Sequence, residues 1–283
     1  MTATATSSLD QLLCSLGVGS DPGRSPAASH AGRVLGGQML AHAVIAAAAT
    51  VDDGKDLHSL HASFVRAGTS GAAMAADVTR LRDGRSTATR QVAVVEEGEP
   101  LLVAVASFGR SLGGPTVTLP APAAPPPEEV PTLQEWAAGF PSGRHWIEQP
   151  PAVELRLPEP PSFLSGVTST SARWHWMRLP RSVGDGHALN AALLAYASDF
   201  FLMDMVFRMH PEELGPGRAN GFSLDHAVWF HRPVRFDEWH LYTQEAVALV
   251  GERGLARGGI YDSRGRLVAS VAQEVLLRLG PTP

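Results

Sequence analysis

The chain contains one pattern twice, and this duplication restricts the fold more than any other feature of the sequence. Phe64-Val-Arg66 recurs as Phe230-His-Arg232, 166 residues later. The same offset relates Val105-Ala106 to Val271-Ala272. A duplicated unit usually places one site at the interface between its copies. We therefore expect the differences between the copies to show where that site lies.

Each copy combines a long helical segment with a group of strands. The helical segments, 38–50 and 187–209, are rich in Ala and Leu, which favour helix. The strands are rich in Val, Ala and Thr, and short turns separate them. They are predicted at 57–66, 74–82, 86–96 and 101–110 in the first half, and at 171–179, 222–232, 241–249, 254–261 and 267–277 in the second. Consecutive strands with short turns predict antiparallel sheet, and hence the α+β class.

A proline-rich segment divides the two copies. Residues 113–129 contain six prolines, which is typical of an extended linker. Residues 131–163 alternate short apolar stretches with prolines and are expected to cross the surface. The predicted organisation is an N-terminal unit at 1–112, a linker at 113–165 and a C-terminal unit at 166–283.

Charge, cysteine content and hydropathy exclude several classes of partner. The net charge is −5 and there is no long basic run, so we expect no nucleic-acid partner. The single cysteine, Cys14, rules out an intramolecular disulfide and fits a reducing compartment. The N-terminus lacks a basic region followed by an apolar core, and the apolar run 39–51 is too short to span a bilayer. We expect a cytoplasmic protein that does not insert into membranes.

Common cofactor and metal motifs are missing from the sequence. There is no Gly-x-Ser-x-Gly elbow, no Walker loop and no Gly-x-Gly-x-x-Gly. His58 and His61 lie three residues apart on a predicted strand, where regular alternation places them on opposite faces. We therefore expect neither a metal site nor an organic cofactor.

Three polar residues lie where the second copy departs from the first. Asp199 lies within an apolar helical segment, where a buried carboxylate is costly unless it is paired. Ser223 begins a predicted strand, and Gln273 lies in a central strand where the first copy has Ser107. Each also has a structural explanation: a capped carboxylate, a strand-edge hydroxyl or an amide satisfied by a neighbour. The residues alone leave both explanations open.

Several motifs resemble those of the acyl-CoA thioesterase II family, and the resemblance covers nearly the whole chain. The most specific is the run Asp-His-x-x-Trp-Phe-His-Arg-Pro at 225–233. Further matches are Val34-Leu-Gly-Gly-Gln38, His58-Ser-Leu-His61 and Leu194-Ala-Tyr-Ala-Ser-Asp199. The resemblance implies a double hot-dog fold, in which two tandem units each wrap an antiparallel sheet around a long helix. It also implies hydrolysis of acyl-CoA and assembly into homodimers or homotetramers.

The family's active-site residues match positions in this chain. The resemblance places its Asp, its Thr or Ser, and its Gln at Asp199, Ser223 and Gln273. The hydroxyl residue is Thr in familiar members. Two further departures are Ala67, where Pro is common, and Asn190, where some members carry His.

A mechanism follows from the resemblance and the chemistry of these side chains. Of the three, only the aspartate is a base near neutral pH. We expect the three residues to hold a water, and Asp199 to take its proton as it attacks the thioester carbonyl. The oxyanion then needs backbone N–H donors. Gly36, Gly37 and Gln38, at the start of the first helix, are the candidate substrate-binding residues.

Two alternatives remain at this point. A hot-dog hydratase or dehydratase needs a His/Asp pair, and only Asp225-His226 offers one. Neighbours on one strand point in opposite directions, which makes this pair a poor dyad. A non-catalytic module that binds acyl thioesters is the other alternative, and the retained Asp, Ser and Gln argue against it.

Overall fold

The computed structural model describes residues 3–18, 32–110, 113–210 and 219–279. Its helices are α1 (Ala3–Ser15), α2 (Gly36–Ala48), α3 (Leu133–Ala138), α4 (Arg144–Glu148), α5 (Ser162–Ser165), α6 (His187–Ser198) and α7 (Leu202–Met209). Its strands are β1 (Asp56–Phe64), β2 (Ala75–Asp83), β3 (Thr87–Glu96), β4 (Glu99–Gly109), β5 (Glu154–Arg156), β6 (Arg173–Arg178), β7 (Ala219–Ser223), β8 (Asp225–Phe230), β9 (His240–Val250), β10 (Arg253–Tyr261) and β11 (Leu267–Leu279).

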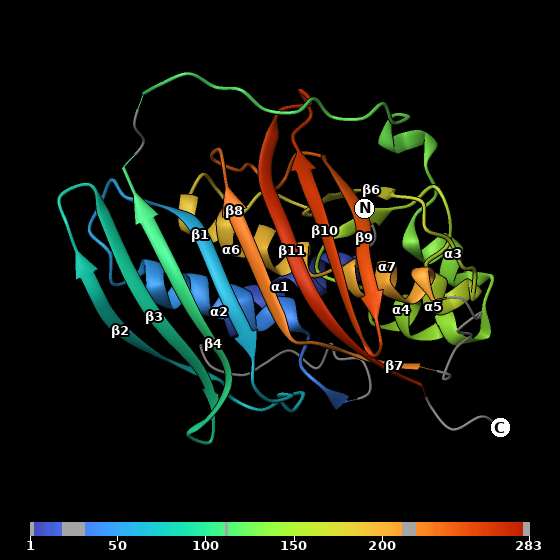
Figure 1. Cartoon of the computed structure of the whole chain (residues 1–283), viewed down its shortest axis with the longest axis horizontal. Coiled ribbons are helices and arrows are strands. Elements are labelled where there is room, and N and C mark those ends of the chain that lie inside the picture. The colour runs from blue at the N-terminus through green and yellow to red at the C-terminus, as the bar shows by residue number, and fades with distance from the viewer. Residues whose placement is uncertain (1–2, 19–31, 111–112, 211–218, 280–283) are drawn as a thin grey trace.

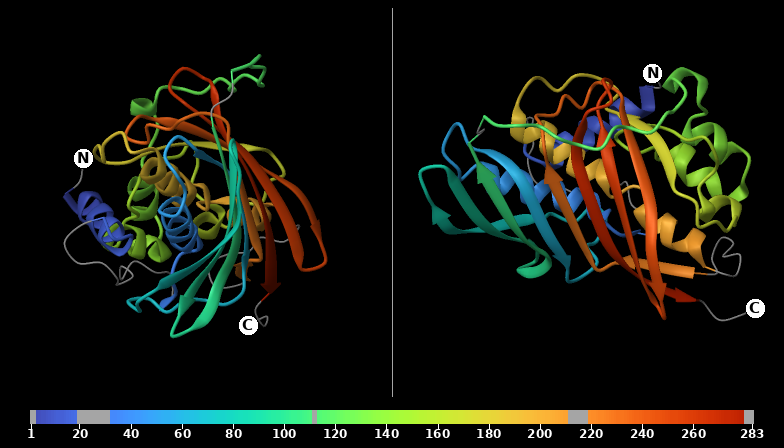
Figure 2. Two further views of the ribbon diagram at one scale, coloured as in Figure 1. Left: turned by 90° about the vertical axis from the view of Figure 1, so that its left-hand side faces the viewer. Right: turned by 45° about the horizontal axis from the view of Figure 1, so that its top comes forward.

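The strands form one antiparallel sheet, and this confirms the predicted α+β class. Their order is β2-β3-β4-β1-β8-β11-β10-β9-β6-β5, and β7 pairs with β11 beside β8. The strands of the two copies meet where β1 pairs with β8. Helices α2 and α6 lie side by side on one face of the sheet (Figures 1 and 2). Each copy thus contributes one long helix and one continuous part of the sheet.

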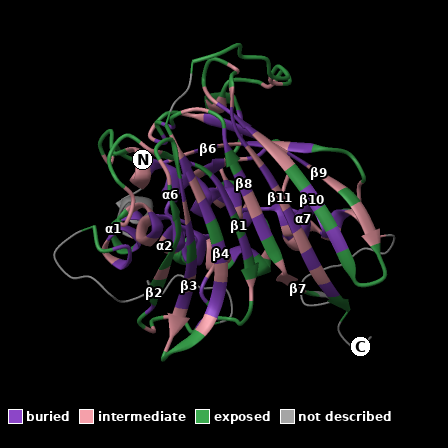
Figure 3. Ribbon diagram, turned by 60° about the vertical axis from the view of Figure 1, so that its left-hand side comes forward, coloured by how far each residue is buried: buried purple, intermediate pink, exposed green. Residues whose placement is uncertain are grey.

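Alanine allows the two central helices to approach each other closely. The alanines of α2 and α6 that face the core have no exposed surface, and they include Ala41, Ala43, Ala192 and Ala195. Figure 3 shows buried residues along the strands alternating with exposed ones, as expected for a sheet covered on one face. The core therefore lies between the sheet and the α2–α6 pair.

The seam between β1 and β8 has the pairing of a local two-fold axis. His61 lies opposite Ala227, its own counterpart at the offset of 166 residues. On either side, Ser59 lies opposite Trp229 and Ser63 lies opposite Asp225. These two pairings exchange equivalent positions of the two copies, which is what a two-fold rotation does.

The offset changes by one residue on the neighbouring strands, and this corrects one prediction. β4 pairs Ala104 with Ala62 of β1, and β11 pairs Val271 with Val228 of β8. The β1 and β8 residues are 166 apart, whereas their partners are 167 apart. The counterpart of Gln273 is therefore Ala106, which is buried like Gln273, and not Ser107.

A bulge in β1 overturns a second expectation. The register of β1 against β4 shifts between Leu57 and Ser59, so the alternation of faces is interrupted there. His58 and His61 are consequently both exposed, rather than on opposite faces.

The helix predicted over 187–209 is in fact two helices. α6 ends at Ser198 with Asp199 as its C-cap, and α7 begins at Leu202. Phe201, with a φ of 68°, redirects the chain because a left-handed residue ends the helical path. The whole segment His187–Met209 has the length and composition of a membrane span, but 83% of its most apolar window is buried. That is the behaviour of a core segment.

The segment before the second copy is only partly a surface crossing. Residues 113–126 pass across the ends of the strands without helix or strand (Figure 1). The prediction that 131–163 crosses the surface is wrong, because Leu133, Leu155 and Leu157 are fully or almost fully buried there. β5 also extends the sheet beside β6. The proposed domain boundaries remain a prediction.

Candidate active site

The structure brings together the three polar residues that distinguish the second copy. Gln273 donates through Nε2 to Asp199 Oδ1 at 2.8 Å and to Ser223 Oγ at 2.7 Å. Gln273 has no exposed surface, whereas 16% of the Asp199 side chain is exposed. A carboxylate, a hydroxyl and an amide therefore share one connected, partly accessible location.

Each residue reaches this location from a different element. Asp199 is the C-cap of α6, where the chain turns into α7. Ser223 is the last residue of β7 and lies opposite Val275 of β11. Gln273 lies two residues before Val275, so both point to the same face of β11. The break between β7 and β8, at Leu224, leaves Ser223 at a strand end beside Gln273.

The first copy contributes a helix N-terminus to the same site. Asp199 Oδ2 accepts the amide hydrogen of Gly37, in the first turn of α2, at 2.8 Å. The N-cap residue of α2, Leu35, makes no side-chain cap bond of its own. Asp199 therefore caps α2 from another helix, and the positive end of the α2 dipole stabilises its negative charge.

Close approach explains the two glycines at the start of α2. A Cβ on Gly37 would collide with the backbone carbonyl of Tyr196 in α6. A Cβ on Gly36 would lie 2.8 Å from Asp199 Oδ2 and 3.0 Å from the Phe64 ring. Only glycine at these positions lets the N-terminus of α2 reach the end of α6.

The Gly37 amide has a partner that the sequence did not suggest. The Gly37 amide donates to Asp199 and is not the free oxyanion donor that the sequence suggested. The Gln38 amide donates to the Leu35 carbonyl at 3.1 Å, and Gln38 is only 2% exposed. Substrate binding by Gly36 and Gln38 remains a prediction.

A buried histidine lies behind Asp199, and its hydrogen bonds fix its tautomer. Ser198 Oγ donates its only hydrogen to the Ala195 carbonyl at 2.8 Å. The 2.8 Å contact between Ser198 Oγ and His226 Nε2 must then be a donation from His226. Burial lowers the pKa of His226, although Asp199 opposes this shift, and a neutral ring follows. Its Nδ1 is then a bare acceptor, 3.9 Å from Asp199 Oδ1 and without a hydrogen-bond partner in the described part of the chain.

Asp225 and His226 do not form a dyad. Asp225 is exposed and accepts the backbone amide of Glu274 at 2.7 Å, whereas His226 is 1% exposed and faces the core. The alternation of β8 therefore separates the two side chains. The sequence pattern gave this geometry but not the proximity of His226 to Asp199, which depends on how α6 packs against β8.

The two family departures lie apart from these contacts. Asn190, in the first turn of α6, donates to the Gly184 and Gly186 carbonyls and accepts the Phe236 amide. It therefore ties two loops to the opposite end of the helix from Asp199. Ala67 is exposed in the connection after β1.

The two-fold-related location in the first copy lacks these polar groups. The C-cap of α2 is Ala49, where α6 has Asp199. The strand counterparts are Leu57 for Ser223 and Ala106 for Gln273. All three are apolar, so of these two related locations only the one at Asp199 holds a base, a hydroxyl and an amide. In the described ranges, no three His, Cys, Asp or Glu side chains gather as a metal site requires.

Sequence comparisons show which family the chain belongs to. The family profile "Acyl-CoA thioesterase N-terminal domain" matches residues 24–109, and "Acyl-CoA thioesterase C-terminal domain" matches residues 121–277. The chain is 32% identical to acyl-coenzyme A thioesterase 8 of Rattus norvegicus, over 88% of this chain and 81% of the relative. It is 31% identical to acyl-CoA thioesterase 2 of Haemophilus influenzae, over 87% of this chain and 88% of the relative.

Solved structures show the same fold. The chain is similar to the acyl-CoA thioesterase II TesB2 of Mycobacterium marinum, with a TM-score of 0.72 and 33% identity over 87% of this chain and 90% of that one. A tesB protein of Mycobacterium avium subsp. paratuberculosis has a TM-score of 0.76 and 27% identity, over 96% of this chain and 100% of that one. These matches confirm the predicted hot-dog fold, and with the two profiles they show that the chain belongs to the acyl-CoA thioesterase family.

Proposed function

We propose that this protein hydrolyses acyl-CoA to free CoA and a carboxylic acid through a water activated by Asp199. The observation that carries the proposal is the Gln273 amide, which donates to both Asp199 and Ser223. The two bonds satisfy the buried Gln273 amide, and they also hold a partly exposed carboxylate next to a hydroxyl. A water-activating site needs both groups at one place.

The contacts support a separate role for each side chain in this proposal. Each Asp199 oxygen accepts one amide hydrogen, one from Gly37 and one from Gln273, so the carboxylate is fixed while lone pairs remain for a water. Ser223 Oγ accepts from Gln273, which leaves its own hydrogen to orient the water or the substrate carbonyl.

The reaction balances with these groups alone. Asp199 takes one proton as the water oxygen bonds to the thioester carbonyl carbon. The tetrahedral intermediate then loses the C–S bond, and the departing CoA thiolate receives that proton. No covalent acyl-enzyme forms at any stage.

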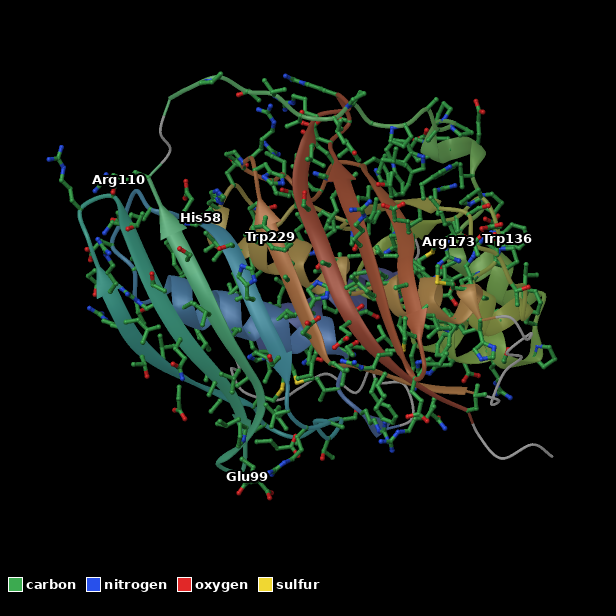
Figure 4. All side chains as sticks on the ribbon, viewed as in Figure 1. His58, Glu99, Arg110, Trp136, Arg173 and Trp229 are labelled. Atoms are coloured by element: carbon green, nitrogen blue, oxygen red, sulfur yellow. The ribbon has the colours of Figure 1, made fainter. Side chains whose placement is uncertain are left out.

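Association into homodimers or homotetramers is part of the proposal. The outer face of the sheet exposes apolar side chains, and they include Val105 at 40%, Trp229 at 37% and Leu255 at 40%. Trp229 and His58 lie on this face, on either side of the seam (Figure 4). Such a surface supports contact with a second copy.

A role in fatty-acid metabolism and a cytoplasmic location are also part of the proposal. The single cysteine, Cys14, fits a reducing compartment.

A thiol-release assay tests the function directly. The purified protein is incubated with acyl-CoA of several chain lengths, and free thiol is followed with a thiol-reactive dye. Release of free CoA and acid supports the proposal. A hydrated or dehydrated acyl-CoA indicates the hydratase alternative, and tight binding without turnover indicates a binding module.

A further inference from the structure

Two side chains of β9 hold the backbone on either side of Asp199. The Tyr242 hydroxyl donates to the Ser198 carbonyl at 2.9 Å. Gln244 donates through Nε2 to the Phe200 carbonyl at 2.7 Å. The two carbonyls that flank Asp199 are thus both bonded to one strand of the sheet.

These contacts take the place of the partners that usually satisfy the carbonyl groups at a helix end. The last carbonyls of a helix lack intrahelical partners and are commonly satisfied by water or by a glycine-based cap. Tyr242 and Gln244 lie two residues apart on β9, so they share a face, and both are almost completely buried. A tyrosine hydroxyl is protonated and can donate near neutral pH, and burial raises the pKa of Tyr242 further.

The turn after Asp199 is constrained as well. Phe201 has the left-handed φ of 68°, which is uncommon for a residue with a bulky side chain. Its ring packs edge-on against His175 at 5.1 Å, and the Arg173 guanidinium lies 5.4 Å from its centre. Such a conformation persists only where the surroundings fix it.

Gln244 buries an acceptor atom, Oε1, that has no hydrogen-bond partner in the described part of the chain. An unpaired buried acceptor destabilises the fold, and an apolar side chain would avoid that cost. The amide therefore contributes less to stability than to the position of the Phe200 carbonyl.

We propose that Tyr242 and Gln244 are positioning residues, which set the direction in which the Asp199 carboxylate leaves the end of α6. This inference rests on the proposed function and deepens it. If either donor is lost, the Asp199 backbone relaxes and the carboxylate no longer meets the attacking water in line. Small misplacements of this kind lower the chemical step more than they lower substrate binding.

The test compares two variants in which a tyrosine loses its hydroxyl group. Tyr242→Phe removes the donor to Ser198. Tyr196→Phe removes a buried hydroxyl from α6, the helix that ends at Asp199. Among the described residues, that hydroxyl accepts the Ala152 amide at 3.3 Å and makes no bond to the backbone around Asp199. We expect Tyr242→Phe to lower kcat about tenfold with KM unchanged. Tyr196→Phe should keep kcat within about twofold. Equal kcat values for the two variants would overturn the inference.

A second comparison separates positioning from general stability. In an Asp199→Asn background, Tyr242→Phe should have little further effect on the residual rate, since the group it positions is gone. An undiminished effect there would show that Tyr242 acts elsewhere, and would overturn the inference.

Gln244→Met provides the test if Tyr242→Phe fails to fold. It removes the donor together with the unpaired acceptor, so its Tm should stay near the wild-type value while kcat falls. An unchanged kcat in folded Gln244→Met would count against the inference. Wild-type protein that releases no CoA would instead refute the proposed function, so the two failures are distinguishable.

Discussion

The carboxylate of Asp199, at the end of α6, accepts the backbone amide of Gly37, in the first turn of α2, at 2.8 Å. Its other oxygen accepts Gln273, from the second copy. One carboxylate thus receives a hydrogen bond from each half of the duplicated chain. Since the equivalent residues of the first copy are apolar, the two halves together build one site.

Asp199→Asn should lower kcat by roughly the 10²- to 10⁴-fold typical of a lost general base. Asparagine offers one acceptor where the structure presents two donors, so it also loses one hydrogen bond. Steady-state thiol release measures the effect. The control is Asp225→Asn, which replaces the charged acceptor of the Glu274 amide by a neutral one and should affect folding or expression more than turnover. An active Asp199→Asn with a folded but inactive Asp225→Asn would exclude Asp199 as the base.

Ser223→Ala and Gln273→Ala should mainly lower kcat, because both side chains orient the water more than they bind substrate. The two effects should combine less than additively, since Gln273 bonds directly to Ser223 at 2.7 Å. Ser223→Thr is the matched control, because it keeps the hydroxyl and should keep activity. Fully additive losses in the double variant would argue against one shared water.

Gly37→Ala should prevent correct packing of α2 on α6, because the added carbon meets the Tyr196 carbonyl. We expect a large fall in Tm and in soluble yield. Gly186→Ala is the control: Gly186 is the N-cap of α6, and a Cβ there meets nothing within 4 Å. Its Tm should stay near the wild-type value. A stable, active Gly37→Ala would mean that the helices do not approach as closely as described.

His175→Phe should change how stability depends on pH. Burial, and then Arg173, lower the pKa of His175 well below 6.5 in the folded protein, so the unfolded chain binds an additional proton in acid. The free energy of unfolding should fall as pH drops below 6.5, by up to about 1.4 kcal/mol per pH unit for this group. Phenylalanine removes that contribution.

Urea unfolding at pH 7.5 and at pH 5.5 measures the difference. Both ring nitrogens of His175 are buried without hydrogen-bond partners in the described ranges, so the phenylalanine variant should be at least as stable at pH 7.5. Parallel losses of stability in the two proteins on acidification would show that His175 does not titrate on unfolding.

The sequence by itself determined the features that repeat or interrupt a local pattern. The 166-residue repeat, the periodic apolar strands and the Ala-rich helices follow from residue type and spacing. Asp199, Ser223 and Gln273 could be singled out because each interrupts an apolar or β-forming pattern, and the family resemblance gave them a common role.

Only the tertiary structure decided how these pieces meet. The shift that matches Gln273 with Ala106, the break of the second helix at Asp199, the cap on Gly37 and the place of His226 all depend on contacts between residues far apart in the chain. Local propensity reports the preference of a segment, whereas register and helix ends are set by which distant donors and acceptors become buried together. The candidate residues were therefore evident in the sequence, but the hydrogen bonds that hold them came from packing one copy against the other.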